Sequence, residues 1–212
     1  ACGNRYIPFV AGAEWQYESS GAGLTSRFTR KLIDASVTGA TSQDQFETLS
    51  GELTRTDRWE CREGAVVVLS TAALAGVRTE GLSADLTITG NEGITLPPDP
   101  RPGDTWSQKV QYGGEVQVAG LRIAAEARLE SNCRAVGFET VTVPAGTFEA
   151  LRVECATAIL TKITYPGVGP MEMPVSGTEI NWYAAGVGWV KSSSTSSPGS
   201  PSETVLLSYR LP

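Results

Sequence analysis

The sequence contains no histidine among its 212 residues. Without that residue the chain cannot form a Ser-His-Asp or Cys-His catalytic arrangement, or a histidine-ligated zinc, copper or haem site. It also lacks a Cys-x-x-Cys pair, a Gly-x-Ser-x-Gly elbow and a Gly-Lys-Ser/Thr phosphate loop, the signatures of thiol-redox proteins, many serine hydrolases and P-loop proteins. We therefore predict no catalytic residue, no metal site and no cofactor.

Basic residues are also scarce. Lys and Arg total 17 against 23 Asp and Glu, which gives a formal net charge of −6. An acidic surface without a run of Lys or Arg repels the phosphates of nucleic acids. We expect no nucleic-acid partner.

Long apolar segments are missing as well. The longest apolar run in the middle of the sequence, Ala65–Leu69, is far shorter than the ~20 residues of a membrane-spanning helix. The chain nevertheless opens with Ala1-Cys2-Gly3. A small residue followed by cysteine and glycine is typical of a bacterial lipoprotein cleavage site, where the cysteine receives the lipid.

From this beginning we predict that Cys2 is lipidated. A processed lipoprotein begins at the cysteine, whereas Ala1 precedes it here, so an ordinary N-terminal cysteine is the alternative. The lipid would make a membrane a partner of the protein. It would place the folded part outside the cytoplasm, on the outer face of a bacterial membrane or in the periplasm.

The spacing of Cys133 and Cys155 predicts a disulfide. Each cysteine shares the strand parity of its apolar neighbours, and both lie at nearly equal distances from a turn that begins at Pro144. Their side chains should meet on facing strands, where a disulfide would close a loop of about 23 residues and contribute about 3 kcal/mol. Export permits this bond, and two buried free thiols are the alternative. Cys61 is then left over, although its pairing with Cys133 or Cys155 stays possible.

Alternating apolar and polar residues predict an all-β protein. The alternation has a period of two in segments 82–89, 121–130, 151–155 and 204–211, which is typical of half-buried strands. The 23 glycines and 12 prolines divide the chain into short segments, as all-β proteins require. The best candidate for a helix is the short segment Leu69–Val77.

A proline-rich connection separates two partly similar halves. Residues 97–103 read Pro-Pro-Asp-Pro-Arg-Pro-Gly and cannot continue a strand. The Gly-x-x-Trp pattern at residues 12–15 recurs at 103–106, and each half later contains a Trp, then a Gly, then apolar residues. We predict a first half at residues 1–96, the connection at 97–103 and a second half at 104–212, folded as one compact domain.

Three ordered motifs span most of the chain. They are the Gly-x-x-Trp segment at 12–15, Val-Thr-Val-Pro-Ala-Gly-Thr-Phe at 141–148 and Trp-Tyr-Ala-Ala-Gly-Val-Gly at 182–188. In these motifs the sequence resembles a group of uncharacterised bacterial exported proteins and lipoproteins. The resemblance implies an antiparallel open barrel, half-barrel or sandwich built from the two repeated halves, similar to open-barrel lipoprotein carrier proteins. It brings no catalytic residues.

Aromatic residues are the remaining candidates for binding. Trp182, Tyr183 and Trp189 lie close together in the last part of the sequence. At the mouth of an open barrel they would contact an apolar ligand that enters it. The alternative is that these rings fill the core, as large aromatic side chains commonly do. We predict a candidate binding site at these three residues.

Three functions are compatible with these observations. The leading hypothesis is an exported, membrane-anchored, non-enzymatic protein that binds an apolar ligand or a neighbouring envelope protein; a lipid carrier would need a continuous apolar cavity above ~300 Å³. The second is an accessory or structural subunit of a membrane-bound complex, held near its partner by the lipid. The third is a glycoside hydrolase with two carboxylates facing each other across a cleft.

Overall fold

The structure, a computed structural model, describes residues 2–48, 51–69, 82–118, 120–165, 167–197 and 199–212. In these ranges the chain folds into twelve β-strands and no helix, which confirms the all-β prediction. Apart from Leu69, the candidate helix at Leu69–Val77 lies outside the described residues. The described ranges also include no helix with the length and apolar character that crossing a membrane requires.

The strands follow one another along the chain. Their bounds are β1 Glu14–Gly21, β2 Leu24–Ala35, β3 Gly39–Thr48, β4 Gly51–Arg62, β5 Ala65–Leu69, β6 Leu82–Gly93, β7 Thr105–Val118, β8 Leu121–Val143, β9 Gly146–Tyr165, β10 Gly169–Ala184, β11 Gly188–Ser197 and β12 Ser202–Arg210. The longest strands, β8 and β9, have 23 and 20 residues and pair as one hairpin.

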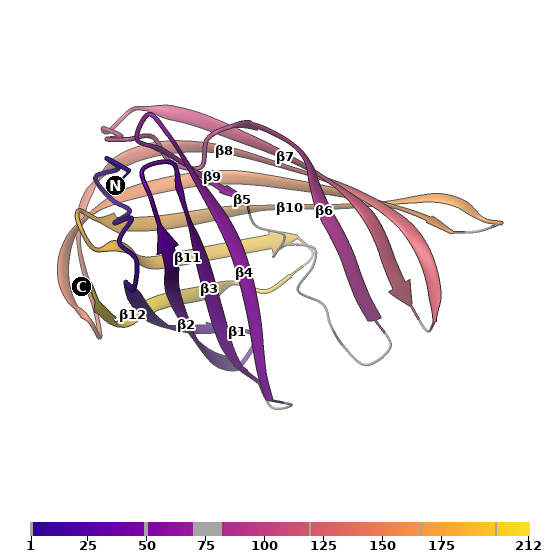
Figure 1. The fold of residues 1–212 in the computed structure, drawn as a ribbon, viewed down its shortest axis with the longest axis horizontal. Coiled ribbons are helices and arrows are strands. Elements are labelled where there is room, and N and C mark those ends of the chain that lie inside the picture. The colour runs from indigo at the N-terminus through magenta and orange to yellow at the C-terminus, as the bar shows by residue number, and fades with distance from the viewer. Residues whose placement is uncertain (1, 49–50, 70–81, 119, 166, 198) are drawn as a thin grey trace.

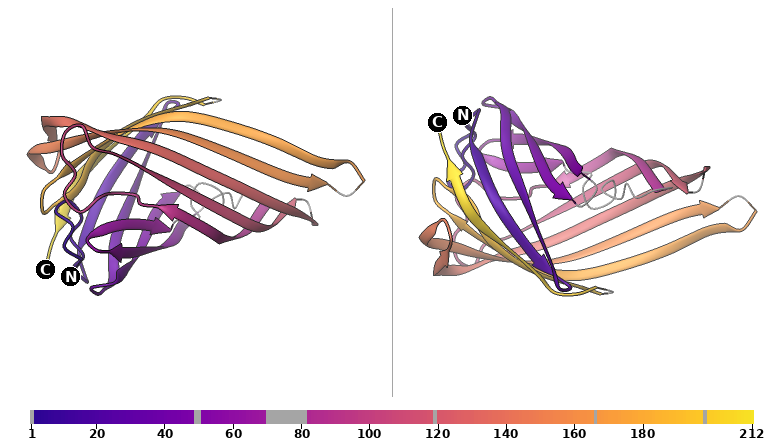
Figure 2. Two further views of the ribbon diagram at one scale, coloured as in Figure 1. Left: turned by 90° about the horizontal axis from the view of Figure 1, so that it is seen from above. Right: turned by 90° about the horizontal axis from the view of Figure 1, so that it is seen from below.

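All of these strands belong to one antiparallel sheet. Its order is β5-β4-β3-β2-β1-β12-β11-β10-β9-β8-β7-β6, so that the first and last strands of the chain, β1 and β12, pair inside the sheet. The sheet curls into a nearly closed barrel with one unsealed seam between its edge strands β5 and β6 (Figure 1, Figure 2). The antiparallel open barrel expected from the sequence is therefore confirmed.

Alternation along each strand determines which side chains enter the barrel. On β8, Ile123, Ala125 and Ala127 are buried while the residues between them are exposed, the period of two expected of a strand with one face on a core. Tight turns fix the register. Ala22 and Gly23 have positive φ angles of 50° and 76°, as a two-residue turn between the twisted strands β1 and β2 requires.

A short set of hydrogen bonds, called the latch below, joins the two sides of the seam. Val66 on β5 and Leu96, which follows β6, form an isolated antiparallel bridge, in which each backbone N–H donates to the carbonyl oxygen of the other residue at 2.8 and 3.1 Å. The hydroxyl of Thr95 extends the latch, because it accepts from the N–H of Val68 and donates to Oε1 of Gln108, both at 2.8 Å. In the described residues this latch, and no strand ladder, joins the two edges of the sheet.

The segment 2–12 caps the end of the barrel next to this latch. Asn4 Nδ2 donates to the carbonyl oxygens of Gly64 and Pro97, at 3.0 and 2.8 Å, which ties the segment to the β4–β5 turn and to the proline-rich connection. The carbonyl oxygen of Arg5 accepts from the N–H of Gly186 in the β10–β11 turn. Three apolar side chains of the segment are buried against the core: Tyr6, Ile7 and Phe9.

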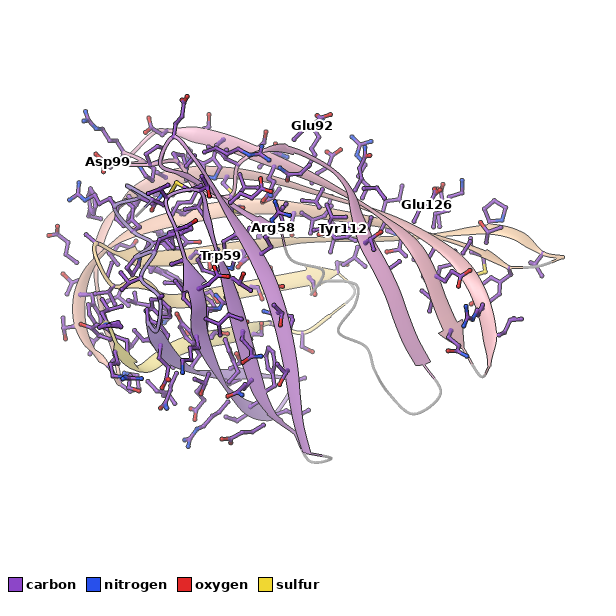
Figure 3. All side chains as sticks on the ribbon, viewed as in Figure 1. Arg58, Trp59, Glu92, Asp99, Tyr112 and Glu126 are labelled. Carbon is purple, nitrogen blue, oxygen red and sulfur yellow. A yellow bond between two sulfur atoms is a disulfide. The ribbon has the colours of Figure 1, made fainter. Side chains whose placement is uncertain are left out.

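The main core lies in the barrel body, and part of the sheet projects beyond it. The far ends of β8, β9 and β10 extend past the barrel (Figure 1, Figure 2). Figure 3 shows Trp59 in the barrel body, and Tyr112 and Glu126 on the projecting part. Tyr112 belongs to a separate small buried cluster with Val110 and Ala127, where burial raises the pKa of its hydroxyl to about 12.

The organisation into two repeated halves stays a prediction. The proline-rich segment 97–103 lies between β6 and β7, which pair with each other from Leu82 opposite Val118 to Gly93 opposite Gln108. The expected connection therefore joins two neighbouring strands of the same sheet.

Two disulfides link the four cysteines. Cys133 is bonded to Cys155, and the register of β8 and β9 places these two residues opposite each other. Cys2 is bonded to Cys61, with a Cα–Cα distance of 5.7 Å. The second bond corrects two expectations. Cys61 is neither left over nor paired with Cys133 or Cys155. In addition, the sulfur of Cys2 is not available for a lipid, because a disulfide sulfur cannot also carry a thioether.

The lipidation motif consists of three adjacent residues, whereas the partner of Cys2 lies 59 residues further along the chain. The N-terminal cap brings them together, since the hydrogen bonds of Asn4 hold the segment against the β4–β5 turn. The pairing of Cys2 with Cys61 can therefore be seen only in the folded structure.

We expect all four cysteines to be oxidised in the purified protein. Iodoacetamide should add no label before reduction and four labels after it, as measured by intact mass spectrometry. Peptide mapping without reduction should recover the peptides of Cys2 and Cys61 as one linked species. A diacylglycerol mass on the peptide that contains Cys2 would contradict this disulfide.

Candidate functional site

A cavity of about 230 Å³ lies inside the barrel body, next to the N-terminal cap. Its walls come from segments that are far apart in the sequence: the cap, β1, β2, β4, β5, the residues after β6, β10 and β11. These segments surround one space because the sheet curls until β5 meets the residues that follow β6.

Five aromatic residues line the cavity: Trp15, Tyr17, Trp59, Tyr183 and Trp189. The rings of Tyr17 and Trp189 pack with their centroids 4.7 Å apart, and the Tyr17 hydroxyl donates to the carbonyl oxygen of Trp189 at 2.9 Å. Trp15 Nε1 donates to a carbonyl oxygen of the β10–β11 turn at 2.7 Å. These contacts fix the rings of β1 against β11, so this part of the wall is already formed without a ligand.

Arg30 on β2 brings a positive charge to the aromatic wall. Its guanidinium carbon lies 5.6 Å from the ring centroid of Trp59 and 5.9 Å from that of Trp189, within the range of cation–π contacts. Nε and Nη2 of Arg30 donate to the two carboxylate oxygens of Asp44, at 2.8 and 2.7 Å. The register of β2 and β3 places the two residues opposite each other. This bidentate pair holds the guanidinium against both indole rings.

The ion pair continues onto β4. Arg55 donates to Asp44 and, at 3.1 Å, to Asp57. Asp44 and Asp57 are only 1% and 3% exposed, so both carboxylates are removed from bulk water. Such burial is tolerated when the charges are paired and hydrogen-bonded. Two arginines and two aspartates from three adjacent strands thus form a neutral network beside the cavity.

The network keeps Arg30 charged, and burial keeps the nearby tyrosines neutral. Burial acts to lower the pKa of Arg30, but the hydrogen bonds and the charge of Asp44 outweigh it and raise that pKa. Burial raises the pKa of the hydroxyls of Tyr17 and Tyr183 well above the ordinary value. Near neutral pH the wall therefore presents a guanidinium and protonated phenols.

Four buried polar atoms on β3, β4 and β11 have no hydrogen-bond partner among the described residues. They are Ser42 Oγ, Asp57 Oδ1, Trp59 Nε1 and Trp189 Nε1. An unpaired buried donor or acceptor costs about 1–3 kcal/mol, so such atoms require an explanation, for example a water or an ion. The interior thus retains unused hydrogen-bonding capacity close to the cavity.

Two of the three binding residues expected from the sequence reach the cavity wall. Tyr183 and Trp189 line it, whereas Trp182 is not among the lining residues. Trp182 Nε1 donates instead to Glu139 Oε2 at 2.8 Å, and Lys191 Nζ lies 5.5 Å from the Trp182 ring centroid. Successive residues of a strand point to opposite faces, so Trp182 and Tyr183 contact different surroundings although they are adjacent.

Sequence reasoning missed the charged part of the site. Arg30 lies between the buried residues Phe28 and Leu32 of β2, and Asp57 precedes the buried Trp59 by two positions on β4. A charged residue that shares the parity of buried apolar neighbours is the signal that could have identified both positions.

The chemistry of the wall can be compared with that of a hydrolase. One carboxylate, that of Glu179, is among the described lining residues, whereas Asp44 and Asp57 are held by arginines beside the cavity. A glycoside hydrolase of the common type needs two opposed carboxylates. In the part of the chain that the structure describes, no three His, Cys, Asp or Glu residues gather as a possible metal site.

Comparison with known proteins adds a family and supports the fold. The DUF3108-like family matches residues 58–206 of this chain. A solved structure from Bacteroides fragilis, described as an exported protein with a YmcC-like fold, is 18% identical with a TM-score of 0.62, over 98% of this chain and 99% of that chain. Another from Parabacteroides distasonis, described as a lipoprotein, is 19% identical with a TM-score of 0.63, over the same shares. No curated protein matches the sequence.

We expect Asp44→Asn to destabilise the protein by about 3–5 kcal/mol, because it removes the charge that compensates the buried Arg30. The free energy of unfolding in urea measures the loss. Asp34→Asn is the matched control, since Asp34 lies exposed on β2, and it should change stability by no more than about 0.5 kcal/mol. A loss below about 1 kcal/mol for Asp44→Asn would mean that the pair behaves like a solvated surface pair.

Proposed function

This chain belongs to the DUF3108-like family, and we propose that it is a non-enzymatic binding protein that acts outside the cytoplasm and holds a small, largely apolar ligand inside its barrel. One observation carries the proposal. A cavity of about 230 Å³, open on one side, is walled by five aromatic side chains, and a buried ion-pair network holds a guanidinium in the same wall. Apolar walls with a few fixed polar groups are typical of ligand sites.

The size of the cavity limits the ligand. A volume of about 230 Å³ is below the ~300 Å³ at which pockets for drug-sized ligands begin. A lipid carrier would also need a cavity above ~300 Å³. The cavity therefore favours a molecule of roughly two fused aromatic rings over a lipid with long acyl chains.

The disulfides support a place outside the cytoplasm. Two bonds involving all four cysteines suit an oxidising compartment, since the cytosol keeps most thiols reduced. The descriptions of the two structurally similar proteins, as exported and as a lipoprotein, agree with this place. We do not propose an anchor at Cys2, because its sulfur is bonded to Cys61.

The projecting hairpin of β9 and β10 favours a second candidate function, an accessory subunit of a membrane-bound complex. Four large apolar side chains of this hairpin are exposed: Leu160, Val168, Met171 and Met173. Exposed apolar groups that gather on one element often mark contact surfaces. Co-purification with membrane proteins that is lost in Met171→Glu/Met173→Glu, but kept in Leu24→Glu on the exposed part of β2, would support this function.

The binding function predicts that the wild-type protein takes up 2-ethylnaphthalene, a neutral probe of suitable size. The probe should shift the ¹H–¹⁵N signals of the Trp59 and Trp189 indoles, which line the cavity, and leave the signal of Trp182 in place. Val68→Phe should weaken binding by about tenfold or more, because Val68 lines the cavity and a phenyl ring would occupy it.

Val37→Phe serves as the control, since Val37 is exposed and outside the cavity wall. It should bind the probe as the wild type does. Binding that is equally strong in Val68→Phe, or a shift of the Trp182 signal alone, would place the probe elsewhere and exclude the cavity as its site.

A further inference from the structure

Arg30 keeps one arm of its guanidinium free of protein partners. Nε and Nη2 both donate to Asp44, the two-pronged geometry typical of arginine and carboxylate. Nη1 makes no hydrogen bond with the residues that the structure describes, and it is not one of the enclosed unpaired atoms of the interior. Because Arg30 lines the cavity, its free N–H groups are available to a molecule that occupies the cavity.

The tryptophans also differ in whether their indole N–H has an acceptor in the protein. Trp15, Trp106 and Trp182 each donate their indole N–H to a protein oxygen, at 2.7–2.8 Å. Trp59 and Trp189 have no acceptor among the described residues, and both line the cavity. The two indoles that contact the Arg30 guanidinium are therefore also the two with unused donors. Both of these indole nitrogens are enclosed, so the accessible donor of this wall is Nη1 of Arg30, and a ligand that brings an acceptor matches it.

The charge balance favours a neutral acceptor over an anion. The positive charges of Arg30 and Arg55 are already matched by those of Asp44 and Asp57. The remaining charged residue of the wall is Glu179, which is negative. An anionic ligand would lose its hydration without meeting an uncompensated positive charge, and it would share the cavity with a like charge. A carbonyl or ether oxygen accepts the same hydrogen bonds without this cost.

We infer that the ligand is a neutral molecule with a flat apolar body and an acceptor oxygen, such as an aryl ketone or ester, whose oxygen accepts from Nη1 of Arg30 while its body packs against the indoles of Trp59 and Trp189. This inference rests on the proposed binding function. It specifies the chemical class of the ligand, which the size and the apolar character of the cavity do not.

Three probes of nearly equal shape separate the possibilities. 2-Ethylnaphthalene has no acceptor, 2-acetylnaphthalene has a neutral carbonyl oxygen, and 2-naphthoate carries a negative charge. The wild-type protein should bind 2-acetylnaphthalene about tenfold or more tightly than 2-ethylnaphthalene, because a hydrogen bond from a charged donor contributes at least that much. It should bind 2-naphthoate about tenfold or more weakly than 2-acetylnaphthalene, because of the uncompensated charge.

Arg30→Lys tests whether Arg30 causes the preference for 2-acetylnaphthalene over 2-ethylnaphthalene. A lysine can still pair with Asp44, but its compact ammonium lacks the planar fork of a guanidinium, so no donor nitrogen occupies the position of Nη1. The variant should bind 2-ethylnaphthalene like the wild type and lose the roughly tenfold preference for 2-acetylnaphthalene. Arg27→Lys is the matched control, because Arg27 lies on the same strand but is exposed and does not line the cavity. It should keep the preference.

Each result separates the inference from the function on which it rests. If 2-ethylnaphthalene and 2-acetylnaphthalene bind equally well to the wild type, the acceptor is not recognised and the inference is overturned, while the binding function stands. Tighter binding of 2-naphthoate overturns it in favour of an anion site. If none of the three probes binds in the cavity, both the inference and the proposed function fail. The ranking on the wild type stands even if Arg30→Lys does not fold.

Discussion

Arg30 and Asp44 form an ion pair inside the barrel, where an unpaired charge would be strongly unfavourable. The pair imposes conditions on its surroundings. Asp44 must lie opposite Arg30 in the β2–β3 register, and Arg55 must reach both Asp44 and Asp57 from β4. A shift of one residue in any of these strands would turn a charge out of the network and leave its partner alone. The buried network therefore helps to specify the register of one flank of the sheet, and it also keeps a guanidinium fixed in the cavity wall.

The other flank supplies the opposite wall, and three contacts bring the two flanks together. The Val66–Leu96 bridge latches the seam, the segment 2–12 caps the adjacent end, and the Cys2–Cys61 disulfide ties that cap to β4. These contacts lie far apart in the sequence but around one end of the barrel. They bring the segments that line the cavity around one space. They also leave the opposite ends of β8, β9 and β10 free to project (Figure 1). The residues that line the cavity are not those of the exposed end of the β9–β10 hairpin.

Much of the fold follows from local pattern. The period of two over 121–130 was enough to predict a strand, and the parity of Cys133 and Cys155 was enough to place them on facing positions of β8 and β9. Arg30 and Asp57 also share the parity of buried neighbours, but charged residues on strands usually face water, so parity alone does not predict that they are buried. The pairing of Cys2 with Cys61 depends on the path of the cap, and the closure of the cavity depends on the Val66–Leu96 bridge. Neither contact has a local signal, since both join segments that meet only after the sheet has curled.

The central claim is that a guanidinium held by Asp44 faces an aromatic cavity and meets the ligand there. An experimental structure of the protein crystallised with 2-acetylnaphthalene tests it most directly. The account predicts the probe inside the barrel, its rings against Trp59 and Trp189 and its carbonyl oxygen within hydrogen-bond distance of Nη1 of Arg30. A probe bound outside the barrel, or an interior filled by side chains with Nη1 bonded to the protein, would contradict it.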